Sequence, residues 1–379
     1  MLYASSLYQI LLPVTSRKPV PSHPPCTFPF AFDSIPDDMG LLEFIYYLGY
    51  FFKKSGSLRN QKRLPRTVVS VGNITTGGTG KTPAVIAIAE EAKQRGYQPC
   101  ILTRGYKGKA RGPCFVSRGD GPLLSVSDAG DEPVLMAERL KGVPIVKGAD
   151  RYGAGVFALQ HVTDPSLFFI LDDGFQHWKL YRDIDILLID STNPFGNGKL
   201  LPVGRLREPL REMKRAGVIV ITKHSGGSSE KEKSSAFSRF DDLINEIRDN
   251  NPDAPLFIAE HLPSGLKTLS GVELSLDTLS GQAVFAFCGI GNPASFKDSL
   301  LRMNANVRGF ETFGDHSSYR RQDIVRIYDK AKRCAANWIV TTEKDIIRMK
   351  GFALPENLVS LRIDFTVDST FYKRIFREA

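Results

Sequence analysis

Hydrophobic residues occur along the chain in two alternating arrangements, and their order predicts the fold class. Short apolar runs rich in valine, isoleucine and leucine are typical of strands buried on both faces of a sheet. Longer stretches with helical periodicity separate these runs. Such runs occupy residues 68–71, 99–103, 143–146, 167–171, 184–189 and 218–222. This alternation predicts an α/β fold with a doubly wound, mostly parallel sheet that binds ligands at the carboxyl ends of its strands.

The alternation is interrupted after residue 222 and resumes at Ala283. Residues 225–238 are rich in serine, glycine, lysine and glutamate, which predicts a surface loop or hinge before a helix at about 240–248. Short strands at 255–259 and 267–274 would form a small β connector. From Ala283 we expect strands at 283–293, near 307, at 338–342 and at 359–365, helices from 294 and from 322, and a loop at 343–345. The pattern therefore predicts two α/β lobes.

The first predicted strand runs into a glycine-rich loop of the phosphate-binding kind. Residues 67–82 read TVVSVGNITTGGTGKT, and a helical pattern follows. Glycines let backbone N–H groups converge on phosphate oxygens, and the start of a helix adds its positive dipole end. The lysine can reach the β- and γ-phosphates, and the last hydroxyl can bind Mg²⁺, although an ordinary strand-to-helix turn is the alternative. The predicted nucleotide-binding residues are Thr75, which replaces the usual first glycine, Thr76, Gly77, Gly78, Thr79, Gly80, Lys81 and Thr82.

Paired carboxylates follow the apolar run at 167–171. Asp172 and Asp173 have the form of a Walker B element, in which Mg²⁺ joins carboxylates to the β- and γ-phosphates. Adjacent carboxylates at a strand end repel each other unless a cation or solvent offsets their charge. They could instead be solvated side chains in a turn. With the glycine loop upstream, the sequence favours a metal site made by Thr82, Asp172 and Asp173.

Five further residues could take part in the chemistry, and each also has a simpler structural interpretation. His177 could orient a phosphate or be a surface histidine. Asp131 could act as a base or orient one, but from the residues alone helix capping is the favoured explanation. His316 is suited to proton transfer near neutral pH, or it is an exposed loop histidine. Arg207 could offset charge on a transferring phosphoryl group, whereas a surface pair with Glu208 would contribute little.

The composition indicates what kind of protein this is, but it does not identify the partner that the protein binds. The chain has 379 residues, of which 42% are hydrophobic and 24% charged, as expected for a soluble globular protein with two domains. The net charge of +9 favours an anionic partner, which could be nucleic acid, an acidic membrane surface or a phosphorylated substrate. Five scattered cysteines without metal-ligand spacing indicate reduced thiols in a cytosolic setting.

Two N-terminal segments differ in character. Residues 1–38 are rich in serine and proline and fit a disordered leader, a transit peptide, or a start placed upstream of a true start at Met39. Residues 41–52, LLEFIYYLGYFF, are too short to span a bilayer and precede a basic cluster. This combination suits a helix in an anionic membrane interface, and a helix docked on the protein's own core fits equally well.

Together, the motifs resemble the tetraacyldisaccharide 4'-kinases, the lipid A 4'-kinases. The combination of GNITTGGTGKTP with DDGFQH is highly specific, and the resemblance covers about 41–365. Ser317 departs from it, because family members often have a second histidine there. The matching segments are SVGNITTGGTGKTP at 70–83, LTRGYKG at 102–108, GDEP at 130–133, DDGFQH at 172–177, LLPVGRLREP at 200–209, FCGIGNP at 287–293, FGDHSSY at 313–319 and VTTEKD at 340–345.

The resemblance implies an activity and a location. The enzyme would use ATP and Mg²⁺ to phosphorylate the 4'-hydroxyl of a tetraacylated glucosamine disaccharide 1-phosphate, giving a 1,4'-bisphosphate in lipid A biosynthesis. It would be a peripheral protein on the cytoplasmic face of the inner membrane of a Gram-negative-type bacterium, anchored by its N-terminal helix. Its partners would be the acylated disaccharide lipid and the inner membrane surface.

The resemblance also implies roles for individual residues. Asp131 and His316 would form a base dyad, brought together as two α/β/α lobes, joined by a small β connector, close over the nucleotide. This favours the base over the cap at Asp131. Arg207 would offset developing charge, with Glu208 and Gln176 in support. Gln176 and His177 are expected among the nucleotide-binding residues.

The domain organisation and two rival functions complete the prediction. We expect a leader at 1–38, an interfacial helix and basic segment at 39–66, a P-loop kinase domain at 67–224, a hinge and β connector at 225–280, and a smaller α/β domain at 281–379.

Two rival functions remain. One rival is a P-loop ATPase that switches conformation to recruit partners. The other is a nucleic-acid-binding protein, but the lysines are dispersed and form no basic stripe with stacking aromatics. We predict a monomer without a nucleic-acid partner.

Overall fold

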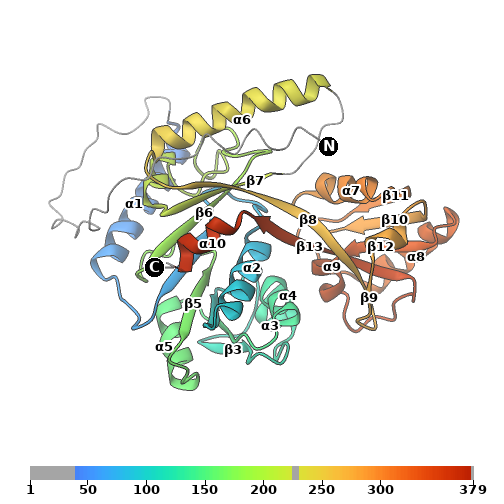
Figure 1. Cartoon of the computed structure of the whole chain (residues 1–379), viewed down its shortest axis with the longest axis horizontal. Helices are drawn as coiled ribbons and strands as arrows, with labels where there is room; N and C mark the ends of the chain where they lie inside the picture. Colours follow the sequence, from blue (N-terminus) through green and yellow to red (C-terminus); the bar gives the residue numbers. More distant parts are fainter. Residues whose placement is uncertain (1–38, 224–229, 377–379) are drawn as a thin grey trace. The chain divides into compact units, whose positions relative to one another are not determined.

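One sheet of thirteen strands runs through the described part of the chain (Figure 1). The computed structural model describes residues 39–223 and 230–376, and those from Leu41 onward belong to one compact unit. The strands are β1 (Val68–Gly72), β2 (Gln98–Thr103), β3 (Cys114–Ser117), β4 (Ile145–Lys147), β5 (Leu167–Asp172), β6 (Ile184–Asp190), β7 (Val218–Lys223), β8 (Leu256–Thr268), β9 (Glu273–Leu274), β10 (Ala283–Cys288), β11 (Asn306–Thr312), β12 (Trp338–Thr342) and β13 (Leu358–Val367).

Helices connect these strands. The α-helices are α1 (Leu41–Arg59), α2 (Lys81–Gln94), α3 (Val126–Ala129), α4 (Asp131–Arg139), α5 (Arg151–His161), α6 (Glu230–Asn250), α7 (Pro293–Arg302), α8 (Arg321–Arg333), α9 (Glu343–Arg348) and α10 (Ser369–Phe376). Two short 3₁₀ helices, η2 (Leu210–Arg215) and η3 (Leu276–Leu279), precede β7 and β10.

The strand order divides the sheet into two parallel sets. The first set, in the order β7-β6-β1-β5-β2-β4, has β3 added antiparallel at its edge. The second set is β11-β10-β12-β13. Strand β8 joins them, because it pairs parallel with β7 and antiparallel with β13. The predicted α/β class with a large, mostly parallel sheet is confirmed, and the domain bounds stay a prediction.

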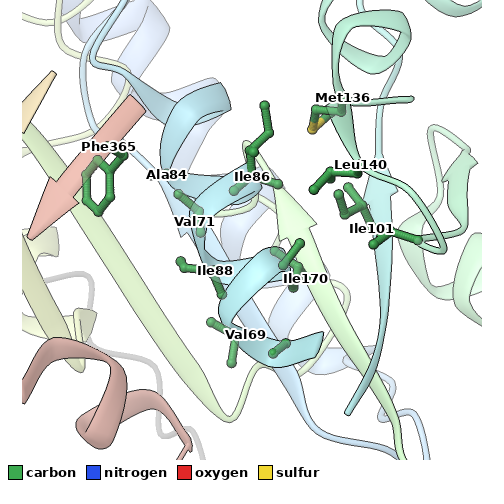
Figure 2. Close-up of a cluster of buried hydrophobic side chains, with 14 of the residues drawn as sticks. Val69, Val71, Ala84, Ile86, Ile88, Ile101, Met136, Leu140, Ile170 and Phe365 are labelled. Atoms are coloured by element: carbon green, nitrogen blue, oxygen red, sulfur yellow. The ribbon is translucent and has the colours of Figure 1, made fainter. Parts of the chain in front are cut away.

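Helices cover both faces of the first set, which explains its continuous apolar runs. Val69, Val71 and Ile170 point to one face and pack with the buried side of α2 (Figure 2). Their neighbours Val68 and Leu171 belong to a second cluster on the other face, which includes buried alanines of α5. Because successive residues of a strand alternate between faces, only a strand covered on both sides is apolar throughout.

The end of the chain packs on the first set. Phe365 of β13 and Phe371 and Phe376 of α10 belong to the same core cluster as α2. The ring of Phe376 stacks on Tyr97 at a centroid distance of 5.5 Å. The last helix therefore stabilises the part of the sheet that carries the glycine loop, although it lies almost 300 residues away in sequence.

Several predicted elements need correction. A helix, α6, begins at Glu230, inside the predicted loop at 225–238, because lysine and glutamate favour helices. The segment at 343–345 is not a loop but the start of α9, whose N-terminus is capped by the Thr342 side chain accepting from the Asp345 amide at 3.2 Å. The two short connector strands predicted at 255–274 are mainly one strand, β8. Strand β3 and helix α10 were not predicted.

Helix α1 confirms the predicted N-terminal helix and is longer than expected. One side docks on the protein: the Glu43 carboxylate accepts from the Leu200 amide at 2.6 Å, and the Tyr46 hydroxyl donates to the Arg207 carbonyl at 2.9 Å. The other side leaves Leu41 and Leu42 exposed by 74% and 61%. Among the described helices, none is long and apolar enough to cross a membrane. The leader predicted at 1–38 lies outside the described residues.

Candidate active site

A cavity of about 1240 Å³ lies between the two parallel sets of the sheet. The glycine loop and the end of β5 line one side, and loops that follow β10 and β11 line the other. The predicted site residues that line it are Thr76, Gly77, Gly78, Thr79, Gly80, Lys81, Thr82, Asp131, Asp172, Asp173, Gln176, His177, Arg207 and His316. Two predicted residues, Thr75 and Glu208, lie outside this lining.

The glycine loop connects β1 to α2 and leaves its backbone open to the cavity. Gly80 has φ +80°, and a Cβ there would lie 2.0 Å from the imidazole of His261 on β8. Gly77 has φ +120°, and its Cβ would lie 2.2 Å from the Arg205 guanidinium. Both positions therefore require glycine. No side chain caps the start of α2, so its first N–H groups remain available for an anion.

Two cations hold Asp173 beside this loop. Lys81 Nζ lies 3.6 Å from Asp173 Oδ1, and Arg207 Nη1 lies 2.9 and 3.0 Å from the two carboxylate oxygens. Burial alone would raise the pKa of Asp173, but the charges of Lys81 and Arg207 outweigh burial and lower it. Asp173 also has φ +49°, an uncommon backbone conformation for a residue other than glycine. The structure thus brings the predicted lysine, arginine and carboxylate together.

Asp172 lies in a more enclosed environment. It is 4% exposed, and the Thr103 hydroxyl donates to its Oδ2 at 2.8 Å. Burial, followed by the carboxylates of Glu132 and Asp173, raises the pKa of Asp172 to about 6. Crowded carboxylate oxygens at a strand end are suited to Mg²⁺, which prefers hard oxygen ligands. Within the described residues no group of three or more acidic, histidine or cysteine side chains encloses a metal site, so a bound ion would need oxygens from substrate and water as well.

Asp131 and His316 meet across the cavity although 185 residues separate them. His316 Nδ1 lies 2.9 Å from Asp131 Oδ2. Asp131 is the first residue of α4 and follows Gly130, so it is not the N-cap residue of this helix. Burial would raise the pKa of Asp131, but the hydrogen bond with His316 and the charges of Arg348 and Lys344 lower it. An ionised Asp131 accepts a hydrogen bond from Nδ1–H of His316 and leaves His316 Nε2 to act as an acceptor.

His316 is held in an unusual conformation. Its φ is +59°, which is rare for a residue with a side chain and is found where surrounding contacts impose it. The Tyr106 ring lies edge-on to the imidazole at a centroid distance of 5.9 Å. Asp315 Oδ2 lies 3.8 Å from Nε2. The imidazole is therefore held from both sides of the cavity.

Glu208 does not reach the cavity, which corrects its expected place among the catalytic residues. Its side chain is fully buried, accepts from Gln176 Nε2 at 2.5 Å and pairs with Arg215 at 2.6 Å. Gln176 in turn accepts from Arg207 at 3.3 Å. Glu208 can thus support Arg207 only through Gln176. The predicted surface pair of Arg207 with Glu208 is wrong, because the two side chains enter different contacts.

Two other predicted residues are placed differently from expectation. Thr75 is buried, forms a backbone bridge with Leu206 and does not line the cavity. His177 is partly buried and lines the cavity, so it is not a surface histidine. Burial, together with the charges of Arg151 and Arg182, lowers the pKa of His177 to about 3. Its imidazole is therefore neutral near pH 7.

The structure adds contacts around the cavity that sequence reasoning did not assign. Glu132 pairs with Lys344 at 2.6 Å, and Arg348 Nε lies 2.9 Å from Asp131 Oδ2. Glu132 and Lys344 stand inside the quoted segments GDEP and VTTEKD, so the motifs pointed to them without indicating a role. Arg348 follows the second segment and had no signal, because its partner is 217 residues away.

Most of the chain matches known proteins that share one description. Residues 41–379 match the family model described as tetraacyldisaccharide-1-P 4'-kinase. The tetraacyldisaccharide 4'-kinase of Syntrophus aciditrophicus is 40% identical over 315 residues, which cover 82% of this chain and 83% of the relative. The enzyme of the same name from Halothermothrix orenii is 38% identical, with 82% of each chain covered.

A solved structure agrees with these relatives. It is described as the "apo" form of LpxK from Aquifex aeolicus in complex with ATP, and its TM-score against this chain is 0.68 at 32% sequence identity. The match covers 88% of this chain and 96% of that one. The resemblance inferred from the motifs is confirmed, and the chain belongs to the tetraacyldisaccharide-1-P 4'-kinase family.

Proposed function

We propose that the cavity divides the family's reaction, phosphorylation of a tetraacyldisaccharide 1-phosphate at its 4' position, between a phosphate-binding side and a base-carrying side. The observation that supports this division is one cavity lined by the open glycine loop and by the Asp131–His316 pair. A nucleotide bound at the loop and a sugar hydroxyl near His316 would then lie within one cavity. Such proximity is what a direct transfer between two substrates requires.

The phosphate-binding side suits ATP. Backbone N–H groups of residues 77–82 and the Lys81 ammonium would hold its β- and γ-phosphates. Thr82, Asp172 and Asp173 offer the oxygen ligands for Mg²⁺, which when bound supplies charge neutralisation on the phosphate oxygens. Arg207 lies beside Asp173 and can offset the negative charge that develops on the transferring group. Gln176 orients Arg207, and His177 can donate to a phosphate as a neutral imidazole.

The base-carrying side supplies proton transfer. His316 Nε2 accepts the proton of the 4'-hydroxyl as that oxygen bonds to the γ-phosphorus of ATP and the bond to the β-phosphate oxygen breaks. ADP leaves, and the imidazolium formed on His316 is stabilised by the Asp131 carboxylate 2.9 Å away. Asp131 also fixes the tautomer with its proton on Nδ1. The pair thus has the geometry of an oriented general base.

Helix α1 suits a lipid substrate. Tyr46, Tyr50 and Lys53 on one side of the helix line the cavity. On another side the apolar residues Leu41, Leu42, Ile45 and Phe52 are 57–74% exposed. This arrangement suits a helix in the inner membrane interface, on the cytoplasmic face, with acyl chains beside it and the sugar in the cavity. We also expect the protein to act as a monomer.

The proposed function is tested by product analysis. The protein is incubated with γ-labelled ATP, Mg²⁺ and detergent-dispersed tetraacyldisaccharide 1-phosphate, and the lipids are separated by chromatography. We expect the label in a doubly phosphorylated glycolipid. ATP hydrolysis without a labelled lipid would contradict the proposal and would favour an ATPase that switches conformation.

A further inference from the structure

We propose that Arg348 is a positioning residue for the Asp131–His316 pair. Its guanidinium holds the Asp131 carboxylate at the distance and angle that His316 needs to work as a base. The inference rests on the proposed base role of that pair. It assigns to Arg348 no contact with either substrate.

The guanidinium of Arg348 connects the two parallel sets of the sheet. Its Nε lies 2.9 Å from Asp131 Oδ2, and its Nη2 contacts the same oxygen. Its Nη1 donates to the Gly289 carbonyl at 2.7 Å and to Asp345 Oδ1 at 3.2 Å. The Arg348 side chain is only 4% exposed. A planar guanidinium with donors in fixed directions, buried among fixed acceptors, has little freedom to move.

The anchor of Arg348 also supports the segment that carries His316. Asp345 is fully buried and accepts from the Gly289 amide at 3.0 Å and from the Tyr319 hydroxyl at 2.7 Å. Tyr319 lies three residues after His316. Arg348 therefore contacts Asp131 directly and reaches the His316 loop through Asp345 and Tyr319. Both members of the pair depend on one side chain.

The acceptor geometry of Asp131 explains why this matters. Its Oδ2 accepts from both Arg348 and His316, whereas its Oδ1 accepts from the Glu132 amide at 3.0 Å. Without the guanidinium, Oδ2 retains only its hydrogen bond with His316, and the carboxylate can rotate about its bond to Cβ. A displacement of about 1 Å in a catalytic group can cost about 100-fold in rate.

A second ion pair, between α4 and a residue that follows α9, provides a matched control. Lys350 follows α9 and pairs with Glu138 of α4, so it too joins the two parallel sets of the sheet. This pair is exposed, with Lys350 at 54%, and it contacts neither Asp131 nor His316 among the described residues. If Arg348 only held the two sets together, removal of Lys350 would have a related effect. If Arg348 acts through Asp131, removal of Lys350 would leave the rate unchanged.

The test compares Arg348→Lys and Lys350→Met in the full chain, each with Asp131 present or replaced by Asn. Lysine keeps the charge but cannot reach Asp131, Gly289 and Asp345 together. We expect Arg348→Lys to lower kcat by about 10- to 100-fold, with the KM for ATP changed by less than about 2-fold. Lys350→Met should leave kcat unchanged. In the Asp131→Asn background, Arg348→Lys should cause no further loss, because the group it positions is already impaired.

Each contrary result has a separate meaning. If Asp131→Asn alone retained the parent kcat, the base proposal would fail. If Asp131→Asn were slow but Arg348→Lys were as fast as the parent, only the positioning role would be wrong. Equal losses from Arg348→Lys in both backgrounds would show a merely structural role. Should Arg348→Lys not fold, Asp345→Asn replaces it, with a several-fold loss expected only when Asp131 is present and equal losses overturning the inference.

Discussion

The two sides of the cavity are built in different ways. The phosphate-binding side comes from a contiguous loop and from the neighbouring strands β1 and β5, whose pairing sets Val71 beside Asp172. The base-carrying side depends on contacts between residues far apart, such as Asp131 with His316 and with Arg348. The proposed phosphate binding would thus depend on local backbone geometry. Base assembly depends on how the two parallel sets of the sheet meet.

The largest expected effects come from breaking the base-carrying side. We expect Asp131→Asn and His316→Ala each to lower kcat by about 10²- to 10⁴-fold, because an oriented general base contributes about that much. The double variant should be no slower than the slower single variant, since the two residues act as one unit. Steady-state rates with labelled ATP measure this. Multiplying losses in the double variant would mean that the two residues act independently.

The phosphate-binding side should respond differently to Lys81→Ala. The Lys81 side chain is 12% exposed, and its ammonium lies beside Asp173, where it can stabilise charge on the phosphates. Its removal should lower kcat/KM by about 10²- to 10³-fold, the usual contribution of one electrostatic donor. Lys93→Ala, at the other end of α2, is the control and should remain close to the parent. A loss below about 10-fold would contradict the proposed role of Lys81.

The same contrast explains what could be predicted from sequence. Valines and glycines at 68–80 determine their own local conformation, so the strand and the loop were predicted correctly. The meeting of Asp131 with His316 was expected only from the family resemblance, because local pattern does not indicate a contact across 185 residues. Arg348 had no local signal at all. The short helix α9 has no periodic pattern that predicts it, because its start depends on one side-chain cap, at Thr342.

A third prediction concerns the support behind Arg207. Arg215 divides its charge between Glu208 and Glu212, and burial raises the pKa of Glu208 from its ordinary value of 4.5 to about 7. A raised carboxyl pKa stabilises the folded state fully below pH 4.5, and this stabilisation is lost as the pH rises through 7. Glutamine does not titrate. Relative to Glu208→Gln, the parent should therefore lose about 3 kcal/mol of unfolding free energy between pH 4.5 and pH 8.

Denaturant unfolding of both proteins at several pH values measures this difference. The side chain of Glu208 is fully buried, so solvent screening should not reduce this difference in unfolding free energy. A difference in unfolding free energy that stays constant from pH 4.5 to pH 8 would show that Glu208 does not titrate in this range. The result would also show which charge state of Glu208 accepts the hydrogen bond of Gln176, the residue that contacts Arg207.

The smallest effect is expected at the membrane side of α1. Deleting this helix would also remove its docking contacts, so substitution of exposed residues is the sharper test. Replacing Leu41, Leu42 and Ile45 by serine should weaken sedimentation with anionic vesicles by about 10-fold, because less apolar surface enters the interface. Val325→Ser on α8, where the side chain is 53% exposed, is the control. Unchanged vesicle binding of the triple variant would count against an anchor at α1.

The separation of the two sides is tested most directly by ATP affinity and single-turnover transfer in Lys81→Ala and His316→Ala. We predict that His316→Ala binds ATP within about 3-fold of the parent but transfers phosphate to the lipid at least about 100-fold more slowly. Lys81→Ala should lose both affinity and transfer. If His316→Ala lost ATP affinity as Lys81→Ala does, or transferred phosphate at the parent rate, the division between phosphate-binding and base-carrying sides would be wrong.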